Sequence, residues 1–490
     1  MLAGRPLVSR DATGAVFFRG GKTLRVPMSM YAEHRAKLVA ALAPFTPCGV
    51  ALLQGGEAVS RHDTDHEELF RQESFFAYLF GVQEPGFFGA VELATGAATL
   101  FAPRLPEEYA VWMGRIPTPA ELALKYGVES VLYVDELPAA LGTAPVVHLL
   151  SGANSDSGAS AKPASFAGLE GLPCELGVLH AALVACRSVK TAGELRLLRY
   201  VCALSSEAHI SVMRQARPGM LEYQLESLFQ HHCYMWGGAR HVGYTSICAC
   251  GPNAATLHYG HAGAPNDREL LASDIALLDM GAEYCCYGAD ITRSFPVSGT
   301  FSPDQALIYN AVLAAQDAVF AAIQPGVEWA DMHRLAEKVI LAALTAAGLL
   351  QGSAEAQAAA QLGAVFMPHG LGHMLGIDTH DVGGFINGRA RLEGPGISKL
   401  RMNRVLEPGM VVTVEPGCYF IKPLLDAAKV NPAQAGLLCL DVLARFEDFG
   451  GVRLEDDVVV TATGMENLTN CPRTTAEVEA VMAGGAWPAP

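Results

Sequence analysis

Two aspartates stand inside apolar stretches that otherwise predict buried strands. Asp279 and Asp290 both belong to the segment LLDMGAEYCCYGADITRSFPV (277–297). A carboxylate in such a stretch is costly to bury unless it is hydrogen-bonded, paired with a cation or bound to a metal. Any fold for this chain must therefore provide partners for both side chains.

A hairpin would bring the two aspartates together. If residues 275–283 and 286–297 are its strands and Tyr284-Cys285 is its turn, Asp279 lies opposite Asp290 on one face. The two charges would then repel, and a cation between them would remove the repulsion. The turn lacks Gly or Asn, so the pattern does not fix the register. The alternative is that each aspartate caps a turn at a strand end.

Three histidines occur in one glycine-rich segment, FMPHGLGHMLGIDTHDVGG (366–384). They are His369, His373 and His380. The glycines permit tight turns and close backbone approach. A single histidine in an apolar stretch is more often structural, but three so close together favour a functional site.

Two glutamates interrupt further apolar strands. Glu415 lies in MVVTVEPGCYF (410–420) and Glu455 in GGVRLEDDVVVT (450–461). Two Asp, two Glu and at least one His form an oxygen-rich ligand set that suits Mn²⁺, with Co²⁺, Fe²⁺ and Zn²⁺ also tolerated. Four carboxylates exceed the needs of one ion and can bridge two, an arrangement used for hydrolysis. The H-E-x-x-H motif of single-zinc proteases is absent.

The first third of the chain predicts an α/β layer domain, because strand-like and helical segments alternate there. A Ser-, Gly- and Ala-rich stretch, 151–168, predicts an exposed loop. We place the domain boundary near 185–190, which gives an N-terminal domain of residues 1–187 and a C-terminal domain of residues 188–490.

The C-terminal domain is predicted to be α+β. Thr191 and Glu194 form a capping box at the start of one predicted helix, and further helices are predicted at 302–323 and 329–348. The remaining motifs lie on strand-like or loop segments. We therefore expect helices that cover a mainly antiparallel sheet.

Charge and cysteine content exclude several classes of protein. The formal net charge of −16 argues against a general nucleic-acid binder. Twelve cysteines are scattered without a C-x-x-C pair, which is typical of free thiols in a reducing compartment. Residues 1–20 lack the apolar core of a signal peptide, and no apolar run reaches about 18 residues. We expect a cytoplasmic protein without a membrane span.

Taken together, these segments resemble the prolidases, the Xaa-Pro dipeptidases of the pita-bread metallopeptidase group. Aminopeptidase P and methionine aminopeptidase belong to the same group. The resemblance extends from FRQESFFAYLFGV (70–82) through LHYGHAGAPNDR (257–268) to GGVRLEDDVVVT (450–461). It implies a pita-bread catalytic domain, preceded by an α/β domain of the creatinase/aminopeptidase P type that serves dimerisation and substrate access. A homodimer is implied in the same way.

The resemblance also implies two divalent metal ions, with Mn²⁺ the first candidate. By their motifs, Asp279 binds one ion and Asp290 bridges both. His373 and Glu415 bind the other ion, and Glu455 is the second bridge. Glu415 is also expected to accept the proton of the nucleophile and pass it to the leaving prolyl nitrogen.

Further residues are assigned to the substrate by resemblance. His258 and His380 correspond to histidines that contact the scissile peptide and stabilise its oxyanion, and Arg453 to an arginine beside the last ligand. His369 is expected to support the site without being a ligand. The remaining assignments are a position near the pocket for Tyr244, the grip on the free carboxylate of the dipeptide for Arg401, and contact with the active site of the partner subunit for Trp112.

Three alternatives use the same fold. An Xaa-Pro aminopeptidase would act on longer peptides with the same metal site, and Arg401 favours the dipeptidase because longer peptides have no carboxylate at that place. A binding protein that had lost catalysis would lack ligands, and a creatinase-like hydrolase would use no metal. The full ligand set argues against both.

Overall fold

The chain forms two compact units, with the boundary between Glu194 and Leu195. The structure, a computed structural model, describes residues 9–11, 14–261, 263 and 265–488. Part of the N-terminal segment considered above, and two alanines of LHYGHAGAPNDR, lie outside the described residues. The boundary placed from the sequence, after residue 187, falls at the end of helix α6 (Leu179–Ser188).

The first unit is built around a mixed six-stranded sheet, as expected for an α/β domain. The strand order is β11-β8-β4-β5-β6-β7, with β4-β5 and β5-β6 antiparallel and the other neighbours parallel. These strands are β4 (Val50–Gln54), β5 (Phe88–Glu92), β6 (Ala98–Ala102), β7 (Ser130–Tyr133), β8 (Val147–Leu149) and β11 (Cys174–Glu175). The helices are α1 (Ser29–Leu42), α2 (Ser74–Phe80), α3 (Tyr109–Met113), α4 (Pro119–Tyr126), α5 (Leu137–Leu141) and α6.

Two small sheets complete this unit. One contains β1 (Ser9–Asp11), β2 (Gly14–Phe17) and β3 (Val26–Pro27), and the other β9 (Gly152–Ala153) and β10 (Ser160–Ala161). The second one lies within the stretch predicted to be a loop. The core forms where β4 contributes Leu52, β5 Phe88 and β6 Phe101, all buried. Burial of consecutive residues in β4 is typical of a central strand covered on both faces.

The second unit is α+β, as predicted, but its strands form several short sheets instead of one. All pairings between its named strands are antiparallel. The sheets are β12-β15-β16, β13-β14-β17, β18-β21-β22 and β19-β20. Their strands are β12 (His241–Val242), β13 (Ile247–Cys250), β14 (Ile275–Asp279), β15 (Ala282–Tyr284), β16 (Tyr287–Gly288), β17 (Thr292–Pro296), β18 (Val411–Val414), β19 (Gly417–Tyr419), β20 (Gly451–Arg453), β21 (Asp456–Val460) and β22 (Met465–Asn467).

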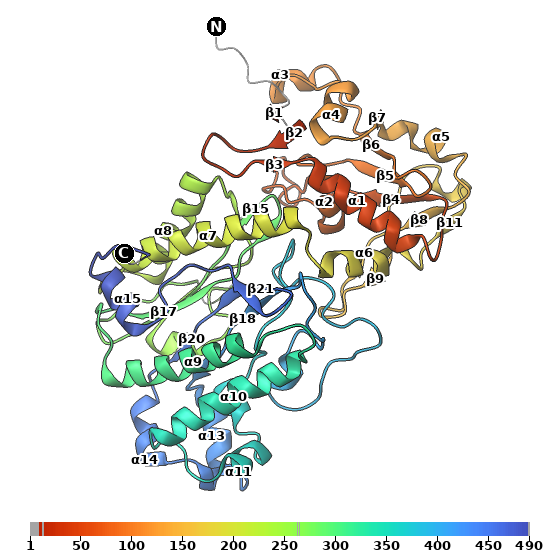
Figure 1. The fold of residues 1–490 in the computed structure, drawn as a ribbon. Coiled ribbons are helices and arrows are strands. Elements are labelled where there is room, and N and C mark those ends of the chain that lie inside the picture. The colour runs from red at the N-terminus through yellow and green to blue at the C-terminus, as the bar shows by residue number, and fades with distance from the viewer. Residues whose placement is uncertain (1–8, 12–13, 262, 264, 489–490) are drawn as a thin grey trace. The chain divides into compact units, whose positions relative to one another are not determined.

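The predicted long helices are confirmed. They are α7 (Ala192–Gln215), α9 (Pro303–Ala322) and α10 (Trp329–Ala346), and the last two lie side by side (Figure 1). The capping box of α9 is formed by Ser302 and Gln305. The other helices are α8 (Glu222–Gly237), α11 (Ala354–Ala359), α12 (Gly363–Phe366), α13 (Lys422–Val430), α14 (Leu440–Leu443) and α15 (Thr475–Met482). Among the described residues, no helix combines the length and apolar character needed to cross a membrane.

The hairpin around the two aspartates forms, but its predicted register is wrong. Asp279 lies opposite Thr292, not Asp290. The turn consists of Cys285 and Cys286, whose φ angles of 51° and 68° are in the left-handed region. A two-residue turn of this hand is normally marked by Gly or Asn, which the sequence lacks. Both aspartates nevertheless line the same cavity, because a shift of two residues preserves the face of a strand.

Gly281 is required by the close approach of the two hairpin strands. A Cβ atom on this residue would lie 1.7 Å from the carbonyl oxygen of Ala289. We expect Gly281→Ala to lower the free energy of unfolding by about 3 kcal/mol or more, because the backbone must move. Gly288→Ala is the control, since its Cβ meets only ordinary contacts beyond 3.4 Å, the nearest at 3.7 Å. It should change the free energy by no more than about 0.5 kcal/mol in urea unfolding. Equal effects of the two substitutions would contradict this prediction.

Candidate active site

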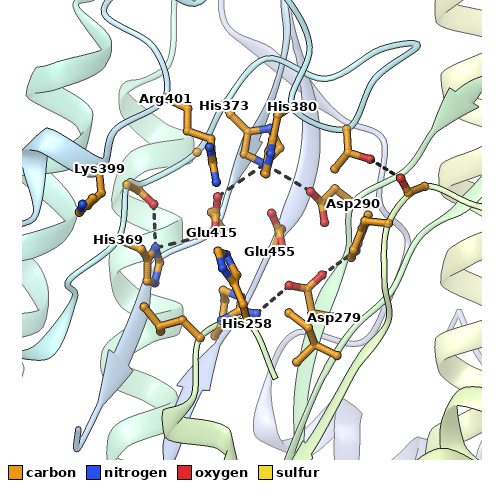
Figure 2. A pocket seen from close by; sticks show the side chains of 18 of the residues that line it. His258, Asp279, Asp290, His369, His373, His380, Lys399, Arg401, Glu415 and Glu455 are labelled. Carbon is orange, nitrogen blue, oxygen red and sulfur yellow. Dashed lines mark hydrogen bonds and ion pairs between the residues drawn. The ribbon is translucent and has the colours of Figure 1, made fainter. Parts of the chain in front are cut away.

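A cavity of about 740 Å³ in the second unit brings together almost all residues singled out from the sequence. Figure 2 shows the carboxylates grouped around a common centre, with the imidazoles of His373 and His380 on one side and that of His258 on another. The predicted site residues that line the cavity are Tyr244, His258, Asp279, Asp290, His373, His380, Arg401, Glu415, Arg453 and Glu455. Trp112 is not among the lining residues. It lies on α3 of the first unit, where 83% of its surface is exposed.

Three of the carboxylates lie at or next to the ends of strands. Asp279 is the last residue of β14, and Glu415 directly follows β18. Glu455 lies between β20 and β21. The β18-β21 ladder ends at the pair Val414–Asp456, and the β19-β20 ladder begins at Gly417–Arg453. The two glutamates therefore lie in the gap between two ladders, where side chains can turn inward.

His373 is oriented toward the carboxylates by its backbone contacts. Its backbone N–H donates to Thr413 Oγ1 at 3.1 Å, and its ring Nδ1–H donates to the carbonyl oxygen of Met374 at 3.0 Å. Nε2 then lies 3.3 Å from Asp290 Oδ2 and 3.7 Å from Glu415 Oε1. A histidine held through Nδ1 in this way offers the lone pair of Nε2 to a metal ion.

Three of the candidate ligands already have the spacing of a metal site. Ligand atoms of Asp290, His373 and Glu455 all lie within 4.8 Å of one another, and all three residues are buried. Glu415 adjoins this group through His373, and Asp279 adjoins it on the other side (Figure 2).

Arg453 links Asp279 to the rest of the site. Its Nη2 lies 2.7 Å from Asp279 Oδ2, and its Nη1 donates to the hydroxyl of Tyr419 at 2.8 Å. Its Nε donates to Thr292 Oγ1 at 3.1 Å, and Thr292 in turn donates to Glu455 at 2.7 Å. The buried guanidinium of Arg453 thus pairs directly with Asp279 and is linked to Glu455 through Thr292, and its one positive charge offsets only part of the charge of the two carboxylates.

Burial alters the proton affinities of the cluster. Burial raises the pKa of Asp279 to about 6 against the opposing charge of Arg453, and it raises the pKa of Glu415 to about 7. Burial and the neighbouring carboxylates hold the pKa of Glu455 well above its usual value. Burial disfavours the charged form of His373, but Asp290 and Glu415 outweigh it and raise its pKa to about 9.

The raised pKa values mean that, when no metal ion is bound, this cluster holds protons at positions that divalent cations could occupy. Four carboxylates and one imidazole are the donor types that divalent ions of the Mn²⁺ class prefer. The residues present therefore fit a centre of divalent metal ions. Such a metal centre would also explain why carboxylates stand in otherwise apolar strands.

The other predicted residues line the same cavity. Burial and the charges of Arg453 and Arg401 lower the pKa of His258, so its imidazole is neutral near pH 7. The ring of His380 meets the ring of His373 edge-on, with centroids 4.5 Å apart. His369 Nε2 lies 2.9 Å from the hydroxyl of Tyr419, and burial lowers the pKa of His369 to about 3.

Sequence reasoning missed Thr292 and Tyr419. Thr292 lies directly within the motif that carries Asp290, and Tyr419 follows the V-E-P-G motif of Glu415. Neither residue type signals a role in a site by itself. Their contacts depend on Arg453, which comes from a distant segment and reaches both side chains.

The metal-free protein should lose stability as the pH rises. The pKa values of Asp279, Glu415 and His373 all lie above their ordinary values of 3.8, 4.5 and 6.5. These groups bind more protons in the folded chain than in the unfolded chain. Buried histidines whose pKa is lowered, such as His209 and His369, act in the opposite direction below about pH 6.5. The free energy of unfolding should therefore fall with rising pH between about pH 7 and pH 9. Urea unfolding after EDTA treatment, with and without added Mn²⁺, measures this. The stabilisation by Mn²⁺ should grow from about pH 6 to pH 8, because the ligands must be deprotonated.

Glu455→Gln provides the control for that experiment. A neutral amide avoids the cost of burying or protonating this carboxyl group, so the variant should stabilise the metal-free protein at about pH 8 and reduce the stabilisation by Mn²⁺. A stabilisation by Mn²⁺ that is independent of pH, or unchanged in the variant, would contradict the assignment of this cluster.

Comparisons with known proteins agree with this geometry. Residues 196–462 match the model of metallopeptidase family M24, and residues 31–145 match the N-terminal domain of aminopeptidase P. The chain is 52% identical to the human Xaa-Pro dipeptidase over 96% of its own length and 97% of that protein.

Solved structures show the same fold. An aminopeptidase PepP of Pseudomonas aeruginosa has a TM-score of 0.75 and 33% identity, with 95% of this chain and 99% of that chain covered. A zinc-substituted aminopeptidase P of Escherichia coli bound to product has a TM-score of 0.75 and 29% identity, with 93% and 98% covered. The second unit has the pita-bread fold expected from the sequence, and the chain belongs to metallopeptidase family M24.

Proposed function

We propose that this protein is an Xaa-Pro dipeptidase, a prolidase, that hydrolyses Xaa-Pro dipeptides and releases proline. The observation that carries the proposal is the buried cluster of four carboxylates and His373 in a cavity that also contains Arg401. The similarity to the human Xaa-Pro dipeptidase, which covers nearly the full length of both chains, supports the same assignment.

The proposed metal ligands are Asp279, Asp290, His373, Glu415 and Glu455. Asp290 and Glu455 would bridge two divalent ions, with Mn²⁺ the first candidate. Ions bound there would lower the pKa of a water molecule and polarise the carbonyl of the scissile bond.

Side chains of the site, one of them a ligand, would perform the remaining steps. Glu415 would accept a proton from the attacking water and pass it to the prolyl nitrogen, because it lies in the cavity beside the other ligands. His258 and His380 line the cavity on either side of the cluster, and each would donate to the developing oxyanion. Arg453 keeps Asp279 in place through its 2.7 Å contact.

Selection of the substrate follows from the chemistry of proline. An Xaa-Pro bond has no N–H on the prolyl nitrogen, so a site for it cannot rely on that donor. Arg401 would instead bind the terminal carboxylate with its guanidinium, which favours dipeptides over longer chains. Tyr244, whose hydroxyl lies 2.5 Å from Asp279 Oδ1, would border the substrate on the metal side.

The proposal extends to assembly and location. The sequence predicts a homodimer in which Trp112 of one subunit reaches the active site of the other, with residues 1–187 serving dimerisation and substrate access. The exposed position of Trp112 supports this role. Scattered cysteines without disulfides among the described residues support a cytoplasmic location.

The second candidate function is an Xaa-Pro aminopeptidase, because the solved structures of similar fold are aminopeptidases P. Hydrolysis of Gly-Pro and Gly-Pro-Ala by metal-depleted protein, with and without Mn²⁺, separates the two. The dipeptidase should cleave Gly-Pro in a Mn²⁺-dependent reaction and leave the tripeptide intact. Preferred cleavage of Gly-Pro-Ala would support the aminopeptidase, and cleavage of neither by the metal-loaded protein would refute both.

Arg401→Ala tests how the dipeptide is selected. Loss of the guanidinium should lower kcat/KM for Gly-Pro by about 10–100-fold, since a hydrogen bond to a charged group contributes about 1.5–3 kcal/mol. The loss should be much smaller for Gly-Pro-amide, which has no carboxylate. Lys399→Ala is the matched control, because Lys399 is another cation of the same cavity. Equal losses for both substrates, or for both variants, would contradict a specific role of Arg401.

A further inference from the structure

Gln316 occupies a position behind the glutamates of the site. It lies on α9, a helix that packs against β19 and β20, and its side chain is fully buried. A buried amide is costly unless its donors and acceptor are all used. The contacts of Gln316 therefore show what it does.

The amide nitrogen of Gln316 contacts two strands at once. Nε2 donates to the carbonyl oxygen of Val414 at 3.1 Å and to the carbonyl oxygen of Leu454 at 3.2 Å. Val414 directly precedes Glu415, and Leu454 directly precedes Glu455. One side chain thus joins the backbones that carry both glutamates.

This link lies where the sheet ladders are interrupted. The β18-β21 ladder stops at Val414, and the β19-β20 ladder starts again at Gly417 and Arg453. The glutamates lie between these points, where Leu454 N–H donates one backbone hydrogen bond to the carbonyl oxygen of Pro416 at 3.3 Å. The distance between the two backbones is therefore held by fewer hydrogen bonds than in a regular ladder. The two N–H groups of one amide can fix it from behind.

The orientation of the amide is fixed as well. Oε1 of Gln316 accepts from Nε and Nη2 of Arg473 at 3.1 and 2.9 Å. A guanidinium can only donate, so it must face the oxygen, and both amide hydrogens must face the carbonyls. Arg473 is itself paired with Asp317 at 2.5 Å.

We propose that Gln316 is a positioning residue that sets the separation of Glu415 and Glu455, and through them the metal affinity of the site. The inference rests on the proposed ligand set. It requires a side chain with two donors at one end, because leucine would leave both carbonyls without this partner and glutamate would place an oxygen against them.

The test compares Gln316→Leu with Gln305→Leu. Gln305 is a buried glutamine of the same helix, and its amide donates to the carbonyl oxygen of Ser273 at 3.1 Å, away from the glutamates. Metal-free proteins are titrated with Co²⁺ by calorimetry, and visible absorption of the bound ion reports its coordination geometry. Urea unfolding of the metal-free proteins measures the loss of stability in each variant, and kcat and KM are measured for Gly-Pro.

We expect Gln316→Leu to weaken binding of at least one Co²⁺ by about tenfold or more, since residues that orient ligands typically contribute 10–100-fold. It should also change the absorption spectrum and lower kcat more than it changes KM. Gln305→Leu should lose stability without these effects. Gln316→Glu keeps the length of the side chain and should give the same result, which covers the case that Gln316→Leu does not fold.

Two outcomes would overturn the inference: affinity and spectrum of both Gln316 variants equal to those of the wild type, or the same changes in Gln305→Leu. Failure of the wild type to bind Co²⁺ would refute the proposed metal site instead, so the two failures are distinguishable.

Discussion

Mutual repulsion among buried carboxylates is the constraint on which the second unit depends. Asp279, Asp290 and Glu455 are each less than a tenth exposed, and Glu415 adjoins them. The guanidinium of Arg453 offsets part of this charge, and protons offset more of it when no metal is bound. Such a cluster is unfavourable for folding on its own. It is understandable as a site whose stability is completed by divalent cations, which makes folding and metal binding linked events.

Polar side chains of two helices contact the backbone next to the carboxylates. On the aspartate side, His209 of α7 is buried, and its Nε2 lies 2.9 Å from the carbonyl oxygen of Met280, the residue after Asp279. On the glutamate side, Gln316 of α9 contacts the carbonyls that precede both ligands. In each case a polar side chain occupies a helix face where an apolar residue would be expected. The positions of the ligands thus depend on contacts from the helices as well as on the strands.

The sequence predicted the residue types of the site better than their spatial relations. Acidic residues in apolar strands stand out because burying them is costly, and this pattern located all four carboxylates. The hairpin register was predicted incorrectly because Cys285 and Cys286 adopt a turn normally marked by Gly or Asn. Gln316 could not be predicted, since a glutamine in a helix is ordinary until the carbonyls that it contacts, from two distant strands, are known. Trp112 remains a prediction, because its role requires a second subunit.

The number of divalent ions bound per chain tests the central claim most directly. Purified protein is depleted of metal, dialysed against Mn²⁺ and analysed for metal content. The carboxylate cluster predicts two ions per chain in the wild type, and fewer in a folded Asp290→Ala variant that lacks a bridging ligand. A folded wild-type protein that binds one ion or none, or a variant that still binds two, would contradict the claim that these carboxylates form a dinuclear metal site.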